Sequence, residues 1–210
     1  GPNTALVDWW RSEHDRLGTD IRLATTTWDM SEHTTVIQAT GSAQGVRGYE
    51  IDDDAIVVDV VDVRRGTVEL PDDGTIVVFD PIGGPIGVAL AEEIGDRAVL
   101  ITQDNIAGNE LSRTGDLAPA NTRLAQAGVT IERRTLLRVA RASEVEVEDR
   151  YSGERRRIAC AALVDCGFRV PSELIDGTVQ IGDAVAPRTI HEAVLEARRD
   201  RRPGRPTQGF

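Results

Sequence analysis

Apolar and polar residues follow two different spacings along the chain, and the order of those spacings predicts an α/β protein. Residues 4–17 place Leu6, Trp10 and Leu17 on one side, as an amphipathic helix does, and Gly18 is suited to end that helix. Short apolar or β-branched runs predict strands, and a cluster of acidic residues predicts a surface loop. The strands fall at 21–24 and 35–39, the loop at 50–54, and a run that fits either a strand or a helix at 57–63.

The clearest unit lies in the middle of the chain. After the turn signal at 72–74, the β-branched run 75–79 is typical of a parallel strand that is buried on both faces. A glycine-rich turn at 80–87 opens a helix that continues to Ile94, and a second buried strand covers 98–102. This is a β-turn-α-β unit of the size that a dinucleotide-binding fold uses.

The rest of the chain predicts a helix, further strands and a last helix. Near-alternating apolar residues after 135, with a turn at Ser152-Gly153, indicate an antiparallel meander, and the arginines at 155–157 are expected on its solvated edge. These elements are a helix at 117–127, strands at 129–132, 136–139, 144–148, 156–159, 161–165 and 180–181, and a helix at 189–199.

These elements together predict an α/β fold in two parts. Residues 66–160 are expected to form a Rossmann-like, three-layer nucleotide-binding domain with the antiparallel β-meander. This domain is inserted in an incomplete second α/β domain of the FAD/NAD(P) type, which residues 1–65 and 161–200 would build. The Arg-, Pro- and Gly-rich residues 201–210 are expected to be a flexible tail.

Composition narrows the classes of partner. The chain of 210 residues has a formal net charge of −11, which argues against nucleic acid or an anionic membrane as its main partner. Its two cysteines, Cys160 and Cys166, form no C-x-x-C motif, so we expect buried, reduced thiols and no zinc or iron–sulfur site. No apolar run is long enough to span a membrane, and no signal peptide begins the sequence, so a cytoplasmic location is expected.

The glycine-rich turn is the strongest candidate binding site. Glycines there let the backbone approach a pyrophosphate, and the following helix offers free N–H groups and the positive end of its dipole. Gly84 and Gly87 take the last two glycine places beside Gly83, while Ile82 takes the first, and Asp104 lies where an acid would accept a ribose hydroxyl. The alternative is a tight strand–helix turn that binds nothing.

Two weaker turns lie near the opposite ends of the chain. Ala39, Thr40 and Gly41 follow one predicted strand, and Gly182 and Asp183 follow another. Small residues after a strand are common, so neither turn is specific by itself. Together they suggest a flavin-binding fold that the central unit interrupts.

The order of these motifs resembles a known family. The runs "ATGS" at 39, "VVFDPIGGPIGVALAEEIG" at 77, "LAQAGVTI" at 124 and "IGDAVAPRTIHEAVLEARR" at 181 are similar to the C-terminal half of the 2,4-dienoyl-CoA reductase and trimethylamine dehydrogenase branch of the old yellow enzyme family. A mycofactocin-associated member is the nearest type. The resemblance covers essentially the whole chain.

The resemblance implies cofactors for each turn. Gly182 and Asp183 would touch the pyrophosphate or ribityl chain of FAD or ADP, Thr189 would start a helix that points toward this site, and residues 39–41 would line the same crevice. The turn at 83–87 would hold NAD(P)H, or an ADP with no redox role. The FMN-binding TIM barrel, the 4Fe–4S cluster and the first glycine motif of the family have no counterpart here, so the chain resembles a fragment or a subunit that another chain completes.

Two functions follow from this comparison. In the first, the chain is the C-terminal nucleotide-binding and electron-delivery region of a flavin-dependent NAD(P)H oxidoreductase, an enoyl or dienoyl reductase or an enzyme like an amine dehydrogenase. In the second, it is a degenerate, non-catalytic structural or regulatory module that binds ADP or nothing and acts as a scaffold or dimer interface. Expected partners are a nucleotide and the missing N-terminal barrel or a partner subunit, and an exposed apolar face would favour a homodimer.

Overall fold

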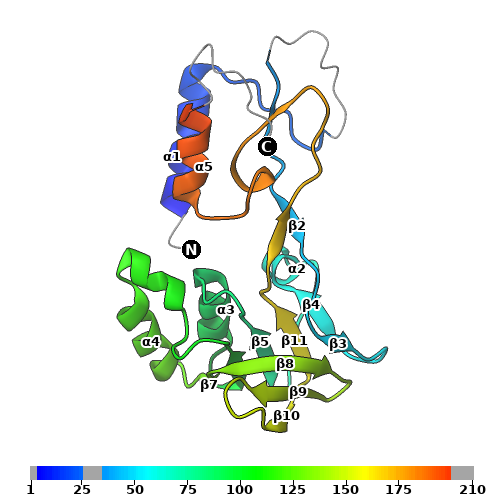
Figure 1. Cartoon of the computed structure of the whole chain (residues 1–210). Coiled ribbons are helices and arrows are strands. Elements are labelled where there is room, and N and C mark those ends of the chain that lie inside the picture. Colours follow the sequence, from blue (N-terminus) through cyan, green and yellow to red (C-terminus); the bar gives the residue numbers. More distant parts are fainter. Residues whose placement is uncertain (1–3, 26–34, 200–210) are drawn as a thin grey trace.

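A computed structural model describes residues 4–25 and 35–199. Figure 1 shows a lower part that contains the large sheets and an upper part that contains both terminal helices, with β2 (Ser42–Gln44) and β12 (Arg169–Pro171) running between them. Within the described ranges, no helix combines the length and the apolar character that crossing a membrane requires. The predicted tail at 201–210 lies outside these residues.

A five-stranded parallel sheet is the centre of the lower part. Its strand order is β4-β11-β5-β6-β7, and every neighbouring pair is parallel. Two of the strands, β4 and β11, come from outside residues 66–160. The bounds are β4 (Val57–Asp59), β5 (Ile76–Phe79), β6 (Ala98–Ile101), β7 (Thr130–Glu132) and β11 (Ala162–Asp165).

Side chains of the central strands are buried on both faces of this sheet. Along β5, Ile76 and Val78 pack with the helices, whereas Val77 and Phe79 pack with the second sheet. A strand that is covered on both faces needs apolar residues at consecutive positions, which explains the unbroken β-branched run. The covering helices are α2 (Val60–Arg65), α3 (Pro85–Ile94) and α4 (Leu117–Gln126), with short 3₁₀ turns η1 (Gly95–Arg97) and η2 (Asn109–Thr114).

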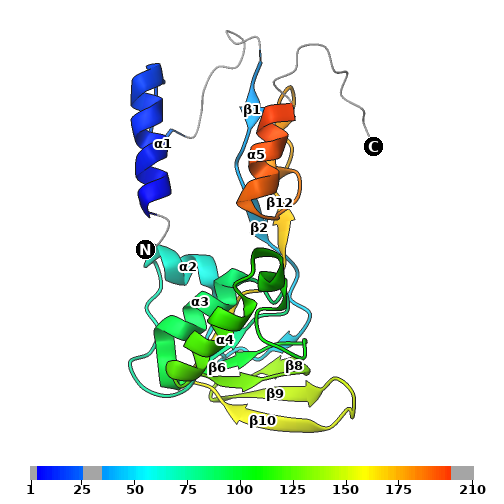
Figure 2. The ribbon, with the colours of Figure 1, turned by 90° about the vertical axis from the view of Figure 1, so that its left-hand side faces the viewer.

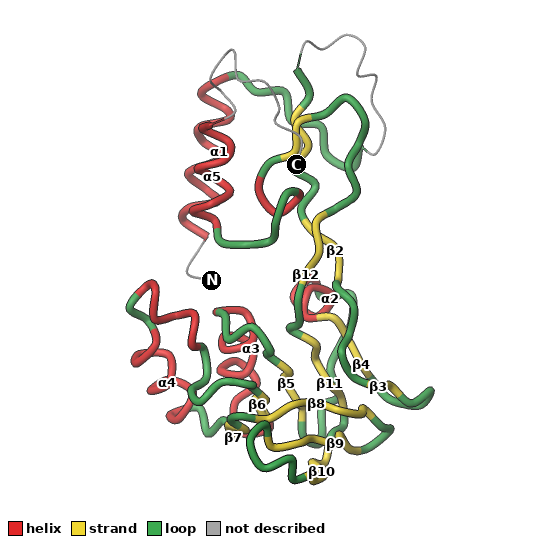
Figure 3. Tube along the Cα trace, in the orientation of Figure 1, coloured by secondary structure: helices red, strands yellow, loops and turns green. Residues whose placement is uncertain are grey.

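The second sheet is the predicted meander with one added strand. Its order is β10-β9-β8-β3, and β3 (Glu50–Ile51) pairs in parallel with β8 (Thr135–Ala140). The acidic stretch at 50–54 is therefore only partly a loop, because its first two residues extend this sheet. The other strands are β9 (Glu144–Asp149) and β10 (Arg155–Ala159), and β10 is an edge strand, as expected for the exposed arginines. The tube in Figure 3 shows this sheet crossing the lower end of the molecule.

The upper part holds little regular structure. Strands β1 (Ile37–Gln38) and β13 (Val179–Gln180) form a parallel pair, and α5 (Ile190–Arg199) follows the short turn η3 (Gly182–Ala184). The helix α1 (Thr4–Leu17) lies where the amphipathic pattern predicts it. Its Trp9 and Trp10 side chains are nevertheless 56% and 39% exposed. Figure 2 separates α1 from α5, which overlap in Figure 1. The strand expected at 21–24 is wrong, since Ile21 and Leu23 are exposed and the segment forms a turn.

Candidate functional site

The glycine-rich turn after β5 is organised by Asp80. Its side chain is buried, and Oδ1 accepts hydrogen bonds from the backbone N–H groups of Ile82 at 3.1 Å and Gly83 at 2.9 Å. This is an Asx-type turn, in which a short carboxylate satisfies the N–H groups of the next residues. Gly84 caps α3 without a side-chain hydrogen bond, and Pro85 begins the helix. The turn is therefore closed by its own carboxylate.

The second carboxylate oxygen of Asp80 faces the helix. Among the described residues, Asp80 Oδ2 has no hydrogen-bond partner. A Cβ placed on Gly87 would lie 2.8 Å from this oxygen, so only a glycine fits beneath the carboxylate. Burial raises the pKa of Asp80 to about 6, while N–H donation from the turn partly offsets that rise and the nearby Asp104 adds to it.

The loop after β6 covers the turn from the other side. Gly83 adopts a φ of +72°, and a Cβ there would lie 2.9 Å from Asp104 Oδ2 and 3.2 Å from the backbone nitrogen of Asn109. The Gly83 carbonyl accepts a hydrogen bond from the N–H of Glu110 at 2.9 Å. Leu111, which is buried with Val88 of α3, holds this loop in place. Asp104 is thus in direct contact with the glycine turn.

Aspartates follow four neighbouring strands at one edge of the parallel sheet. Asp59 ends β4, Asp165 ends β11, Asp80 follows β5 and Asp104 follows β6. Carboxyl ends of parallel strands meet at one edge, which is where open α/β sheets bind ligands. Burial raises the pKa of the Cys166 thiol at this edge, and Asp80, Asp165 and Asp59 raise it further. The edge is therefore strongly acidic.

Two of these aspartates are paired with arginines of the connecting segments. Asp165 Oδ2 lies 3.0 Å from Arg47 Nε and accepts a 2.8 Å hydrogen bond from the hydroxyl of Tyr49. Asp59 Oδ2 lies 2.8 Å from Arg169 Nη1. Because Arg47 follows β2 and Arg169 belongs to β12, these ion pairs anchor the connection between the two parts to the sheet. They leave Asp80 and Asp104 as the acidic groups on the turn itself.

The turns from the two ends of the chain come together in the upper part. Pairing of β1 with β13 places Ile37 beside Val179 and Gln38 beside Gln180. Since the pair is parallel, the residues that follow both strands, 39–41 and 181–183, lie at the same edge. The buried amide of Gln38 holds this edge, donating to the Glu173 carbonyl at 2.7 Å and accepting from the N–H of Ile175 at 2.9 Å.

Small and hydroxyl residues line this edge. Ala39 and Thr40 are exposed, and Thr40 Oγ1 lies 2.6 Å from Ser172 Oγ. Gly182 has a φ of +64° and its N–H donates to Glu196 Oε2 at 2.7 Å, while Asp183 Oδ1 accepts from the N–H of Arg188 at 3.2 Å. The hydroxyl of Thr40 and the carboxylate of Asp183 are groups that can contact the hydroxyls of a nucleotide's sugar or ribityl chain.

Thr189 directly precedes the last helix, which the sequence pattern predicts to begin at Thr189. Its N–H donates to Glu192 Oε2 at 3.2 Å, its hydroxyl also reaches this carboxylate, and α5 starts at the next residue. The contact from the Glu192 carboxylate to the Thr189 N–H is one half of a capping box. The hydroxyl of Thr189 thus has a structural partner within its own helix.

A polar hollow of about 510 Å³ is lined by residues that belong to neither turn. Asn105, Arg133, Arg134, Asp149 and Arg156 are among the residues that line it. Its walls carry both signs of charge, and several of these charges pair with one another. Arg134 Nη2 is 3.8 Å from Asp149 Oδ2, and Arg156 Nη2 is 2.5 Å from Glu132 Oε2. Within the described ranges, no three His, Cys, Asp or Glu residues are grouped so as to hold a metal ion.

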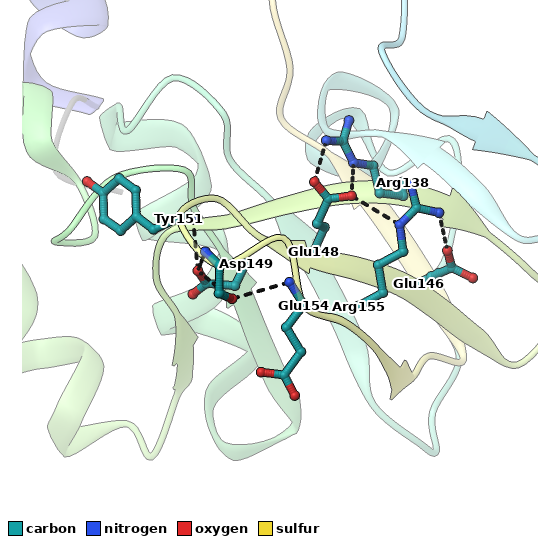
Figure 4. Close-up of polar contacts among 8 residues, drawn as sticks. Arg138, Glu146, Glu148, Asp149, Tyr151, Glu154 and Arg155 are labelled. Atoms are coloured by element: carbon teal, nitrogen blue, oxygen red, sulfur yellow. Dashed lines mark hydrogen bonds and ion pairs between the residues drawn. The ribbon is translucent and has the colours of Figure 1, made fainter.

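Ion pairs also cover the outer face of the meander. Glu148 Oε1 lies 2.8 Å from Arg138 Nη2, and Glu148 Oε2 lies 3.1 Å from Arg155 Nε. Arg155 Nη1 also lies 3.0 Å from Glu146 Oε1 (Figure 4). At the hairpin tip, Asp149 Oδ1 accepts from the N–H groups of Tyr151 and Ser152. These contacts satisfy the charges of an exposed edge strand, which is a common protection of such edges.

Comparison with solved structures shows where this fold occurs. Histamine dehydrogenase from Rhizobium sp. 4-9 is 25% identical, over 83% of this chain and 31% of that chain, with a TM-score of 0.73. 2-Naphthoyl-CoA reductase has a TM-score of 0.75 at 18% identity, over 90% of this chain and 30% of that one. An HOCl-induced flavoprotein disulfide reductase from Escherichia coli has a TM-score of 0.56 at 18% identity, over 78% and 42%.

These likenesses confirm the predicted α/β nucleotide-binding fold. The chain spans about a third of the length of histamine dehydrogenase and of 2-naphthoyl-CoA reductase. No family model matches the sequence, and no curated protein does either.

The two candidate sites differ in how well they fit a nucleotide. At the glycine turn, the N–H groups of Ile82 and Gly83 are already bound by Asp80, and Asp104 lies on Gly83, so the residues present do not fit a pyrophosphate. At the edge of β1 and β13, Thr40 is exposed and Asp183 is half-buried. The structure brings the predicted site residues together in two groups. One group holds Gly83, Gly84, Gly87 and Asp104, and the other holds residues 39–41, 182 and 183.

Asp80 is the residue whose role sequence reasoning missed. Asp80 lies directly after a buried strand. It stands two residues before Ile82, which takes the place of the motif's first glycine. An aspartate followed by a proline is a common start of a turn, and this was the available signal.

Proposed function

We propose that this chain is the nucleotide-binding region of a larger flavin-dependent oxidoreductase of the 2,4-dienoyl-CoA reductase and trimethylamine dehydrogenase type. Its fold is similar to about a third of histamine dehydrogenase (31% of that chain) and of 2-naphthoyl-CoA reductase (30% of that chain). The edge formed by β1 and β13 would contribute one side of an FAD or ADP site. A barrel or partner subunit outside this chain would supply the remaining part and the reacting centre.

The observation that carries this proposal is the parallel pairing of β1 with β13. It joins two turns that are about 140 residues apart, with Ile181 N–H donating to the Gln38 carbonyl at 3.0 Å. Thr40 would contact a sugar or ribityl hydroxyl, and Asp183 would accept a hydrogen bond from another. A flavin bound there would supply hydride or electron transfer, and the residues of this chain would only hold and orient it.

The upper part also supports a partner. A sheet of two strands, each of two residues, is too small to be stable alone, and α1 and α5 bury none of their described side chains. Exposed apolar side chains gather on these elements, which is typical of a surface that another segment covers. They are Leu6, Val7, Trp9, Trp10, Leu17, Ile37, Ile190 and Val194.

The test is to denature the purified chain and identify any released nucleotide by mass spectrometry, for the wild type and for Asp183→Asn. FAD or ADP in the wild type and a clear loss of it in Asp183→Asn are expected. Asp176→Asn, which changes an exposed carboxylate near the same segment, is the matched control and should keep the nucleotide. A nucleotide retained equally by all three proteins would contradict the assignment of this edge.

A degenerate, non-redox scaffold is the second candidate function. The self-closed glycine turn favours it, because a turn that binds its own carboxylate has no need of a ligand. Titration of the chain with NADH, ADP and FAD, followed by fluorescence, separates the two functions. Saturable binding of FAD or NADH supports the first function, and binding of ADP alone, or of none of the three, supports the second.

A further inference from the structure

The glycine turn of the central unit carries an anion of its own. In turns that bind dinucleotides, the backbone N–H groups and the helix N-terminus face the pyrophosphate. Here the N–H groups of Ile82 and Gly83 donate to Asp80 Oδ1 at 3.1 and 2.9 Å. A carboxylate thus accepts the hydrogen bonds that a phosphate oxygen would take.

We propose that Asp80 acts as a built-in substitute for phosphate and keeps the glycine turn closed to dinucleotides. The side chain is buried and lies between the end of β5 and the first turn of α3, so it cannot leave without rearrangement of the turn. Gly87 is needed for this packing, because a Cβ at that position would lie 2.7 Å from Asp80 Cβ. In dinucleotide motifs the corresponding glycine allows close helix–strand packing, and here it makes room for a carboxylate.

The loop that covers the outer side of the glycine turn also opposes the binding of a dinucleotide, through both its position and its charge. Asp104 Oδ2 and the backbone of Asn109 lie against Gly83, and the N–H of Glu110 donates to the Gly83 carbonyl. A pyrophosphate approaching the turn would meet this loop. It would also face two carboxylates, those of Asp80 and Asp104, whose charges repel its own.

The inference concerns residues 76–111 and is independent of the edge formed by β1 and β13. If no flavin or ADP binds at the edge of β1 and β13, the glycine turn can still be closed. If the glycine turn is open, the edge of β1 and β13 can still bind a flavin or ADP. If both stand, the enzyme takes its electrons by a route other than NAD(P)H bound at this turn.

Backbone NMR of the full chain tests the proposal on the wild type. The amide resonances of Ile82, Gly83 and Gly84 are expected to stay in place when NADH, ADP or inorganic pyrophosphate is added to millimolar concentration. Saturable shifts of these three amides in the wild type would overturn the proposal. Shifts confined to residues 39–41 and 182–183 would support it and would locate nucleotide at the other edge.

Two variants test the carboxylate itself. Asp80→Gly frees both N–H groups and is expected to bind pyrophosphate at least tenfold more tightly than the wild type. Asp80→Asn keeps an oxygen that accepts the same two hydrogen bonds, so it should leave the turn closed and serves as the matched control. Equal affinity of all three proteins for pyrophosphate would overturn the proposal. If Asp80→Gly does not fold, the wild-type and Asp80→Asn amide shifts still decide, because both proteins are expected to show none.

Discussion

Asp80 and Gly87 are in contact across the first turn of α3, so closely that a Cβ on Gly87 would lie 2.7 Å from the Cβ of Asp80. One residue follows the central strand and the other belongs to the helix that packs on it. This contact couples the buried carboxylate, the glycine-rich turn and the seat of α3 on the sheet. It also makes the energetic role of Asp80 measurable.

The free energy of unfolding should depend on pH through Asp80. Burial raises its pKa to about 6 from 3.8, with Asp104 and the Cys166 thiol nearby on the same edge. The folded chain therefore binds this proton more tightly than the unfolded chain. Protonated Asp80 therefore stabilises the folded chain. This contribution to the free energy of unfolding is present in full below about pH 4 and is lost as the pH rises through about 6.

Asp80→Asn should remove this dependence while it keeps the turn's hydrogen bonds. Two pKa units correspond to roughly 3 kcal/mol, which is the upper limit of the stabilisation expected for Asp80→Asn near pH 8. Urea denaturation at several pH values measures it. Asp73→Asn, at an exposed turn, is the control and should have little effect. A variant less stable than the wild type near pH 8 would contradict the prediction.

Gly87→Ala should destabilise the chain although alanine favours helices. The added methyl group would overlap Asp80, and such overpacking costs about 1–3 kcal/mol. In an Asp80→Gly background the obstacle is absent, so the same substitution should cost less. A double-mutant cycle by urea denaturation measures this coupling, and strictly additive effects would show that the two residues do not interact.

Asp165→Ala should loosen the connection between the two parts. The carboxylate is buried and binds Arg47 and Tyr49, so its removal leaves Arg47 without this partner and Tyr49 without its acceptor. The loss of a fully buried partner costs about 3–5 kcal/mol. Because the Arg47 side chain is 27% exposed, we expect a smaller cost, about 1–3 kcal/mol. Arg113→Ala removes an exposed pair with Glu110 within one 3₁₀ turn and should cost less than about 1 kcal/mol. Thermal unfolding compares the two, and equal effects would refute the anchoring role.

On the meander, Arg138→Ala should raise the pKa of Glu148. Hydrogen bonds from Arg138 are the main cause that holds this pKa below its ordinary value, and Arg155 contributes less. Arg155→Ala should therefore raise the pKa of Glu148 by a smaller amount. Carboxyl ¹³C NMR titration measures both shifts, and a larger effect of Arg155→Ala would contradict the larger contribution of Arg138. Figure 4 shows both arginines in contact with Glu148.

Much of the lower part could be predicted from local pattern. The run 76–79 is apolar at every position because β5 is buried on both faces, and a helix that begins at Pro85 and ends at Gly95 carries its own start and stop signals. The run 57–63 was ambiguous for a physical reason. It contains both β4 and the start of α2, and Asp59, which caps α2 by accepting from the N–H of Val61 at 2.6 Å, marks the boundary.

Elements that depend on distant partners could not be predicted. Strands β2 and β12 have three residues each, 42–44 and 169–171, and exist only because they pair with each other. Glu50 and Ile51 become a strand because β8 offers a parallel edge, although three aspartates follow them. Ile21 and Leu23 have strand-like composition but no strand beside them in the described residues, and so form a turn.

The sequence by itself determined the α/β class, the buried strands, the glycine turn and the position of its acidic neighbours, because each of these depends on residues close together in the chain. Only the tertiary structure decided what the turn holds. The direction of the Asp80 side chain depends on how α3 sits on β5 and on the loop at 104–110, which brings Asp104 onto Gly83. Likewise, residues 39–41 and 182–183 form one edge only because β1 and β13 pair across the whole chain.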